Sequence, residues 1–144
     1  MSRRERALAL SRLPENKRIL LVPHPDRSTI SEEYRFIQRE IEAGNAYLTE
    51  RYAGEKMTEQ MEDFRARGWN LDAALWCGTL WMIENSELLR RAWDDWWDQN
   101  LKFGMMDQLS LPVILEAHGI EPQSMPVNLW RNQYFSWIKH RKEM

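Results

Sequence analysis

His24 and Arg27 stand in the loop Pro-His-Pro-Asp-Arg, directly after the apolar run Ile19–Val22. Ligand-contacting loops of α/β folds commonly follow buried strands, and an arginine can hold a carboxylate or phosphate with two parallel hydrogen bonds. The loop also has a purely structural interpretation, in which His24 bonds local backbone and Arg27 pairs with Glu32 or Glu33 of the next helix. The residues alone leave both interpretations open.

Asp107 and Gln108 open a second polar segment, shortly after Gly104. A carboxylate at the start of a helix either caps that helix or points into a cleft, where it can act as a general base. Spacing alone favours the capping role. The chemical alternative requires the fold to bring Asp107 close to the His24 loop.

Three other groups of residues favour structural roles. Asp94, Asp95 and Asp98 share one side of a helical segment and could hold a hard cation, but a solvated helix face is the commoner arrangement. Trp96–Trp97 belong to an apolar stripe at helical spacing, which is typical of core packing rather than of sugar stacking. Cys77 lies in an apolar run, which indicates a buried and unreactive thiol.

The elements that must position these residues can be predicted from periodicity and from helix-start and helix-stop residues. We expect helices over residues 3–13, 31–44, 55–67, 87–103 and 107–118, with Pro112 tolerated near a first turn or at a bend. We expect strands over residues 19–22, 79–83 and 124–127, and an irregular segment over residues 45–54. This order predicts one α/β domain over residues 1–144, rich in helix, with a small mixed sheet.

Composition bounds the function classes. The chain has 144 residues, of which 43% are hydrophobic and 29% charged, as in an ordinary globular domain. With a net charge of -2, the chain has no overall positive potential that would attract nucleic acid. Residues 1–18 nevertheless contain six basic and only two acidic side chains. Those residues predict either a short basic helix with a solvated face or an arm that contacts phosphate, and the solvated face is favoured.

The single cysteine excludes an internal disulfide and fits a reducing, cytoplasmic setting. No apolar run approaches the roughly 20 residues that a membrane helix needs, so the sequence predicts no membrane partner. The sequence also lacks a phosphate-binding Walker loop, a glycine-rich dinucleotide turn and paired cysteines for zinc. A soluble α/β domain with a polar loop after its first strand is what the residues alone predict.

Several short motifs, taken in order, resemble those of a known family. They are His24-Pro25-Asp26-Arg27 with Ser31-Glu32-Glu33; Gln60, Phe64, Arg65 and Gly68; the strand within residues 75–83; Trp96-Trp97; Asp107-Gln108-Leu109-Ser110; and Asn128, Asn132, Tyr134-Phe135 and His140. Together they resemble a glycosyltransferase-like domain of plant mucilage-related and bacterial polysaccharide-related proteins, long catalogued as a domain of unknown function. The resemblance covers residues 24–140 and implies a helix-rich, three-layer-like fold similar to the C-terminal half of a GT-A glycosyltransferase.

The resemblance implies a role for each matching residue. Asp107 would be the catalytic base or a carboxylate that orients the acceptor, and Gln108 would bind a sugar hydroxyl. His24 and Arg27 would contact the diphosphate or the acceptor. The other implied contacts are Glu33, Trp97 and Asn128 for substrate and His140 for a metal or phosphate. The implied ligands are a nucleotide-sugar with Mn or Mg and a glycan acceptor.

The chain also departs from this family. Met106 and Met82 or Ile83 stand where the family commonly has arginines, which weakens the expected phosphate binding. Only 23 residues precede His24, whereas a GT-A fold places its nucleotide-binding half and Asp-x-Asp metal site there. We therefore expect either a split transferase that borrows this half from a partner chain or a non-catalytic binding or assembly protein, with self-association possible through apolar surface.

Overall fold

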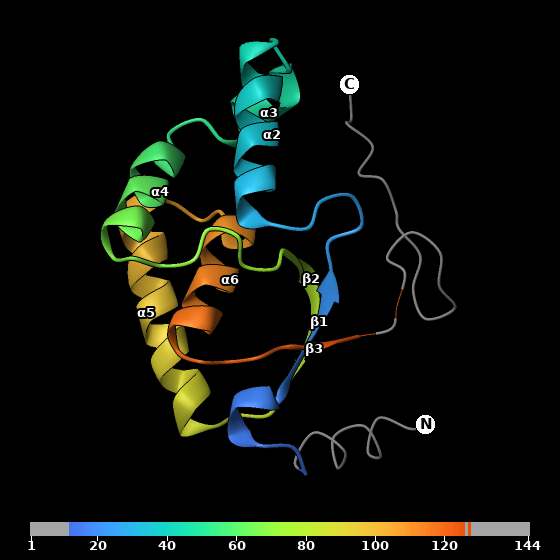
Figure 1. Cartoon of the computed structure of the whole chain (residues 1–144). Coiled ribbons are helices and arrows are strands. Elements are labelled where there is room, and N and C mark those ends of the chain that lie inside the picture. Colours follow the sequence, from blue (N-terminus) through green and yellow to red (C-terminus); the bar gives the residue numbers. More distant parts are fainter. Residues whose placement is uncertain (1–11, 126, 128–144) are drawn as a thin grey trace.

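The computed structural model describes residues 12–125 and residue 127 (Figure 1). The helices of this part are α2 (Ile30–Glu42), α3 (Ala46–Arg51), α4 (Met57–Ala66), α5 (Glu87–Phe103) and α6 (Asp107–Ala117), and a 3-10 turn, η1, covers Glu15–Lys17. The strands are β1 (Ile19–Pro23), β2 (Trp76–Ile83) and β3 (Gln123–Ser124). The predicted class, a helix-rich α/β fold with a small mixed sheet, is confirmed.

The sheet of the described residues has the strand order β2-β1-β3. Strand β1 pairs antiparallel with β2 and parallel with β3, so the first strand in the sequence is the central one. The pairing with β2 is irregular, because Leu21 pairs with Trp81 whereas the next residue, Val22, pairs with Cys77. Residues 78–80 therefore have no partner on β1, and they form a bulge of the kind that often redirects side chains beside functional sites.

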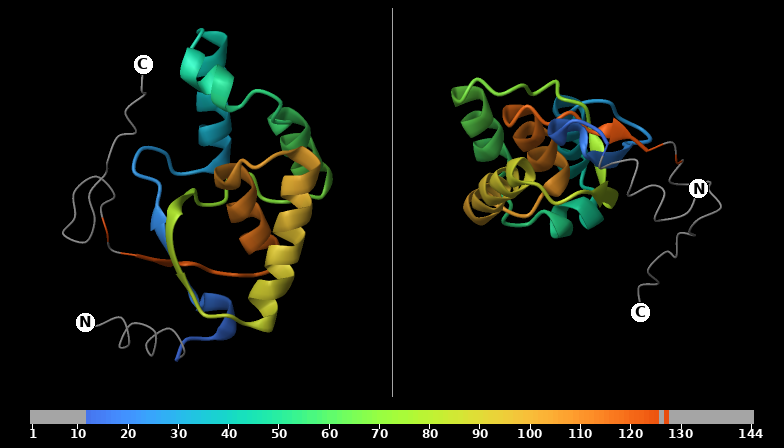
Figure 2. Two further views of the ribbon diagram at one scale, coloured as in Figure 1. Left: turned by 180° about the vertical axis from the view of Figure 1, so that it is seen from behind. Right: turned by 90° about the horizontal axis from the view of Figure 1, so that it is seen from below.

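The described helices cover one face of the sheet, as the view from below shows (Figure 2). Ile19 and Leu21 of β1 point to this side and pack with buried residues of α5 and α6. The next residue, Val22, points the other way, against Cys77 and Met125. The alternation is that of a strand with both faces apolar. A helical layer on the second face, which the three-layer expectation requires, is not found among residues 12–125 and 127.

Side-chain caps fix the starts of helices α2 and α5. Thr29 caps α2 in a capping box, in which its hydroxyl accepts the Glu32 amide while the Glu32 side chain bonds the Thr29 amide. Ser86 caps α5 by accepting the Leu89 amide at 3.2 Å. Each cap satisfies amides that the first helical turn leaves without partners, which fixes where these helices begin.

Three sequence predictions were wrong in detail. Residues 45–54 are not irregular throughout, because the Asn45 side chain accepts the Leu48 amide and starts the short helix α3. Strand β2 begins at Trp76 rather than at Thr79, since Trp76 and Cys77 already pair with β1, and β3 ends at Ser124. Pro112 lies inside α6, beyond its first turn, so of the two expected alternatives the bend is the one that remains. The helix expected at residues 3–13 falls largely outside the described part.

No helix among the described residues is long and apolar enough to cross a membrane.

Candidate functional site

The loop that connects β1 to α2 is held by its own histidine. The Nδ1 atom of His24 accepts the backbone amides of Asp26 at 3.2 Å and of Arg27 at 3.1 Å. Burial lowers the pKa of His24, against the opposing effect of the nearby Glu33 carboxylate. The Nε2 atom of His24 lies 3.4 Å from the Nη2 atom of Arg27. His24 thus plays the turn-stabilising role, and its second ring nitrogen is next to the Arg27 guanidinium.

Arg27 reaches from this loop back to α2. Its Nε donates to the carboxylate of Glu33, whose side chain is only 4% exposed. The guanidinium also stacks on the Phe36 ring, with its carbon 4.0 Å from the ring centre. The pairing foreseen as the structural alternative is therefore present, with Glu33 rather than Glu32 as the partner. Breaking such a pair would leave a buried carboxylate uncompensated.

Asp107 is the first residue of α6, and Met106 rather than Asp107 is the N-cap. The Asp107 Oδ1 atom accepts the Gln108 amide at 2.9 Å, while the other side of the carboxyl group lies against Gly78 in the bulge of β2. A Cβ at position 78 would lie 3.0 Å from the Asp107 Cγ and still closer to Oδ2. The carboxyl group of Asp107 can therefore occupy this position only because residue 78 is glycine. Burial raises the pKa of Asp107, although the Gln108 amide opposes that shift.

The His24 loop and Asp107 meet at one end of the sheet. Val22 pairs with Cys77, which places the end of β1 beside the bulge, and α2 packs against α6 (Figure 1). Burial, with Glu33 and Asp107 next in effect, raises the pKa of the Cys77 thiol to about 11. These carboxylates therefore approach the same residue from two helices. The fold brings His24, Arg27 and Glu33 into contact with one another, and it places Asp107 against Gly78, the residue that follows Cys77.

Sequence reasoning missed two contributors to this site. Gly78 lies in the apolar segment that includes Cys77, but its role in admitting the Asp107 carboxylate depends on the bulge. Arg51 lies on α3, a segment expected to be irregular, and its charge lowers the pKa of Asp107 against the larger effect of burial. Asn45, directly after Gly44, is the sequence signal for that helix, because its side chain caps the first turn of α3.

The remaining predicted site residues lie elsewhere or outside the described part. Gln108 follows Asp107 and is half-buried, whereas Trp97 is 58% exposed on the outer side of α5. Trp97 therefore does not pack in the core, contrary to the interpretation of the tryptophan stripe, although Trp96 does and donates from Nε1 to Ser110. Asn128 and His140 fall outside the described residues.

The described residues do not form a metal-binding group. Within residues 12–125 and 127, no three His, Cys, Asp or Glu side chains come together as ligands would. Asp94, Asp95 and Asp98 are exposed, and Asp95 bonds the Nε2 atom of His118 at 2.7 Å. The described residues therefore do not fit a bound Mn or Mg ion.

No protein-family model, curated protein or solved structure matches this chain. The glycosyltransferase resemblance therefore remains a prediction from short motifs, and the chemistry of the site is what the geometry supplies. That chemistry is a fixed carboxyl group of raised pKa beside a buried arginine–glutamate pair.

Proposed function

We propose that this chain forms the acceptor side of a glycosyl-transfer site, in which Asp107 takes the proton from an acceptor hydroxyl. The observation that carries the proposal is the seat of Asp107, whose carboxyl group is fixed between the Gln108 amide and Gly78. Burial raises its pKa, which makes its ionised form a stronger base than an exposed aspartate. General bases work best when their pKa approaches the working pH.

In this proposal the acceptor oxygen attacks the anomeric carbon of a nucleotide-sugar while its proton passes to Asp107. The bond from the anomeric carbon to the diphosphate breaks, and the electron pair leaves with the diphosphate. Gln108 binds a sugar hydroxyl beside the base. His24 and Arg27, whose Nε2 and Nη2 atoms lie 3.4 Å apart, contact the acceptor or the diphosphate. These assignments draw on the motif resemblance and on the convergence of the residues at Cys77 and Gly78.

The proposal places nucleotide binding on a partner chain. Departure of a diphosphate needs strong electrostatic stabilisation, which often provides the largest part of the catalytic effect. In the proposed arrangement this part corresponds to the C-terminal half of a GT-A fold, and the partner supplies the nucleotide pocket and the Mn or Mg ion. The complete cleft would then lie over His24, Arg27 and Asp107.

The direct test is a transfer assay with UDP-, GDP- and TDP-sugars and manganese, on the chain alone and on the chain co-expressed with its partner. We expect turnover only with the partner, and we expect Asp107→Asn to abolish it. Asp98→Asn, at an exposed carboxylate of α5, is the matched control and should keep full activity. Transfer by the chain alone would contradict the split arrangement. Unchanged transfer by Asp107→Asn would contradict the role of the base.

One observation favours a second candidate, a non-catalytic binding or assembly protein. Trp97, Leu101 and Met105 are 58%, 71% and 73% exposed, and the first two lie one turn apart on α5. Large exposed apolar side chains in a row commonly mark an interaction surface. Light scattering should then show a dimer or larger species that Trp97→Ser with Leu101→Ser converts to monomer. A wild-type monomer at high concentration would refute self-association through this face.

A further inference from the structure

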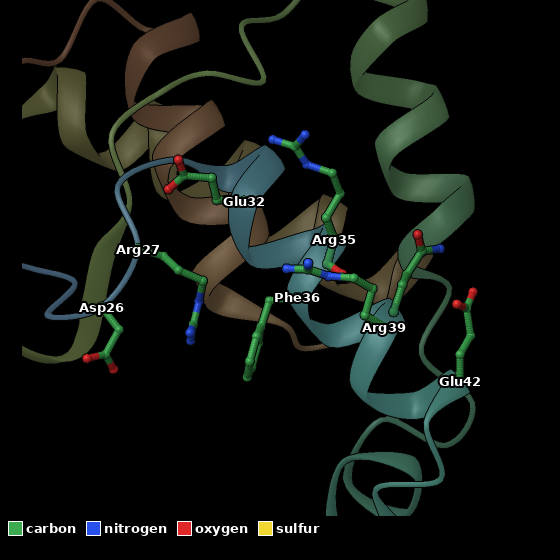
Figure 3. Close-up of a pocket in the computed structure, with 8 residues that line it drawn as sticks. Asp26, Arg27, Glu32, Arg35, Phe36, Arg39 and Glu42 are labelled. Carbon is green, nitrogen blue, oxygen red and sulfur yellow. The ribbon is translucent and has the colours of Figure 1, made fainter.

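The outer face of α2 carries a groove of about 770 Å³ (Figure 3). It begins at the β1–α2 loop and follows the helix, and its lining residues are Asp26, Arg27, Glu32, Arg35, Phe36, Gln38, Arg39 and Glu42. A volume of this size lies within the usual range for small-molecule sites. Arg27 links the groove to the candidate site, because it pairs with Glu33 on one side and stacks on Phe36 on the other.

Arg35 and Arg39 of the groove are exposed, and in the part of the chain that the structure describes only their Nε atoms form hydrogen bonds, along the helix. The Nε atom of Arg35 donates to the Ser31 carbonyl at 3.0 Å, and that of Arg39 donates to the Arg35 carbonyl at 3.3 Å. These bonds fix the base of each side chain along the helix. Within the described residues neither guanidinium has a carboxylate within 4.0 Å, so the Nη atoms of both are open to an anionic group. One helical turn separates the two side chains.

The carboxylates of the groove differ from one another in availability. Glu32 accepts the amides of Ser28 at 2.7 Å and Thr29 at 3.3 Å, and these bonds lower its pKa. Asp26 and Glu42 are exposed and form no ion pair among the described residues. The groove thus presents three guanidinium groups, two carboxylates ready to accept hydroxyl hydrogen bonds, and one aromatic ring.

We infer that this groove binds acidic saccharide units, so that the acceptor of the proposed reaction is an oligosaccharide carrying isolated carboxylate or sulfate groups. Each part of such a ligand meets a matching group on the wall. Arg35 and Arg39 bind the anionic substituent with charge-assisted hydrogen bonds, and Asp26 and Glu42 accept ring hydroxyls. The inference rests on the proposed function, since it names the acceptor for the site at Asp107.

The charge balance of the lining distinguishes this ligand from a polyphosphate chain. A phosphodiester backbone has one negative charge per residue and few hydroxyls, and the three carboxylates of the lining would repel it. The whole chain is also slightly acidic, with a net charge of -2. A saccharide with occasional acidic groups can bind both the guanidinium groups and the carboxylates of the lining. Nucleic acid is therefore the disfavoured occupant, and it enters the test below as an outcome that would overturn the inference.

The test is calorimetric binding of four probes to the full chain. They are a uronate tetrasaccharide, the same tetrasaccharide after reduction of its carboxyl groups, a sulfated neutral tetrasaccharide, and a four-residue single-stranded oligonucleotide. We expect the uronate or the sulfated probe to bind at least tenfold more tightly than the reduced one, and the stronger of the two identifies the acidic group. Equal binding of the reduced probe, stronger binding of the oligonucleotide, or no binding of either acidic saccharide would overturn the inference.

Surface variants locate the binding and separate this inference from the proposed function. Arg35→Gln with Arg39→Gln should weaken the acidic saccharide about tenfold or more, while Arg91→Gln, at an exposed arginine of α5, should leave it unchanged. Unaltered binding by the double variant would place the ligand elsewhere and refute the groove. Asp107→Asn should bind the saccharide as the wild type does. Retained transfer by Asp107→Asn, with binding lost in the double variant, would refute the base and leave the groove standing.

Discussion

Replacing Gly78 with alanine tests the seat of Asp107 without touching the carboxylate itself. The new methyl group would lie 3.0 Å from the Asp107 Cγ and nearer still to Oδ2, whereas ordinary contacts of a carbon atom are about 3.5–4.0 Å. The carboxyl group must therefore move by roughly 1 Å, and it then loses the 2.9 Å hydrogen bond from the Gln108 amide. Gly78→Ala should therefore change the free energy of unfolding through the displacement of the Asp107 carboxyl group.

The expected magnitude follows from two opposing effects. Loss of a hydrogen bond to an ionised group costs about 1.5–3 kcal/mol, and alanine in place of glycine recovers about 0.4–1 kcal/mol by restricting the unfolded chain. We expect Gly78→Ala to lower the free energy of unfolding by about 1–2 kcal/mol. In an Asp107→Ala background the new methyl group at position 78 has no carboxylate to displace, so Gly78→Ala should leave the free energy of unfolding unchanged or raise it slightly.

The assay is urea unfolding of the four proteins of this double-mutant cycle. The interaction energy between positions 78 and 107 should reach about 1–3 kcal/mol, well above the roughly 0.5 kcal/mol scatter of independent sites. A second cycle, with Asp98→Ala in place of Asp107→Ala, is the control and should be additive. Additivity in the first cycle as well would show that the Asp107 carboxylate does not lie against Gly78.

Three further predictions concern the same end of the sheet. Burial raises the pKa of Asp107 above its ordinary value of 3.8, so the stabilisation that the protonated carboxyl group contributes is complete below about pH 4 and is lost as pH rises through the raised pKa. The free energy of unfolding of the wild type should therefore fall between about pH 3 and 7 relative to that of Asp107→Asn. Free energies of unfolding that change in parallel with pH in the two proteins would contradict this prediction. Arg27→Ala should lower the free energy of unfolding by about 3 kcal/mol, and adding Glu33→Gln should restore much of the loss, as thermal unfolding would reveal. With a thiol pKa of about 11, Cys77 should react with a disulfide reagent at pH 8 only after urea unfolds the chain, so rapid labelling of the folded chain would be the contrary result.

Local signals predicted the helices well. Thr29 and Glu32, three residues apart, are a capping pair that can be seen in the sequence, and Ser86 before Glu87 is another cap. Such residues act on amides within one turn, so no knowledge of the rest of the fold is needed. Asn45 is a cap of the same kind, but the six-residue helix after it is too short to show an apolar period.

The site was predictable only where its residues are close in the chain. His24, Arg27 and Glu33 are near neighbours, and their hydrogen bonds follow from a tight loop before a capped helix. The contact of Asp107 with Gly78 joins two elements through an irregular strand pairing, and neither composition nor period reports such a bulge. The exposure of Trp97 also depends on tertiary packing, because α5 buries Leu89 and Ala92 and turns Trp97 outward.

The place of β1 at the centre of the sheet has a consequence for how the chain folds during synthesis. Strand β1 leaves the ribosome first, yet its neighbours are residues 76–83 and residues 123–124. Both of its edges must stay unpaired while the helices between them are made, and pairing of distant segments is the slow part of folding. The capped helix α2 can form early from local contacts alone. The nascent chain therefore carries the apolar strand Ile19–Pro23 without its strand partners until residues 76–83 and then residues 123–124 have been made, and unpaired strand edges of this kind are prone to aggregation.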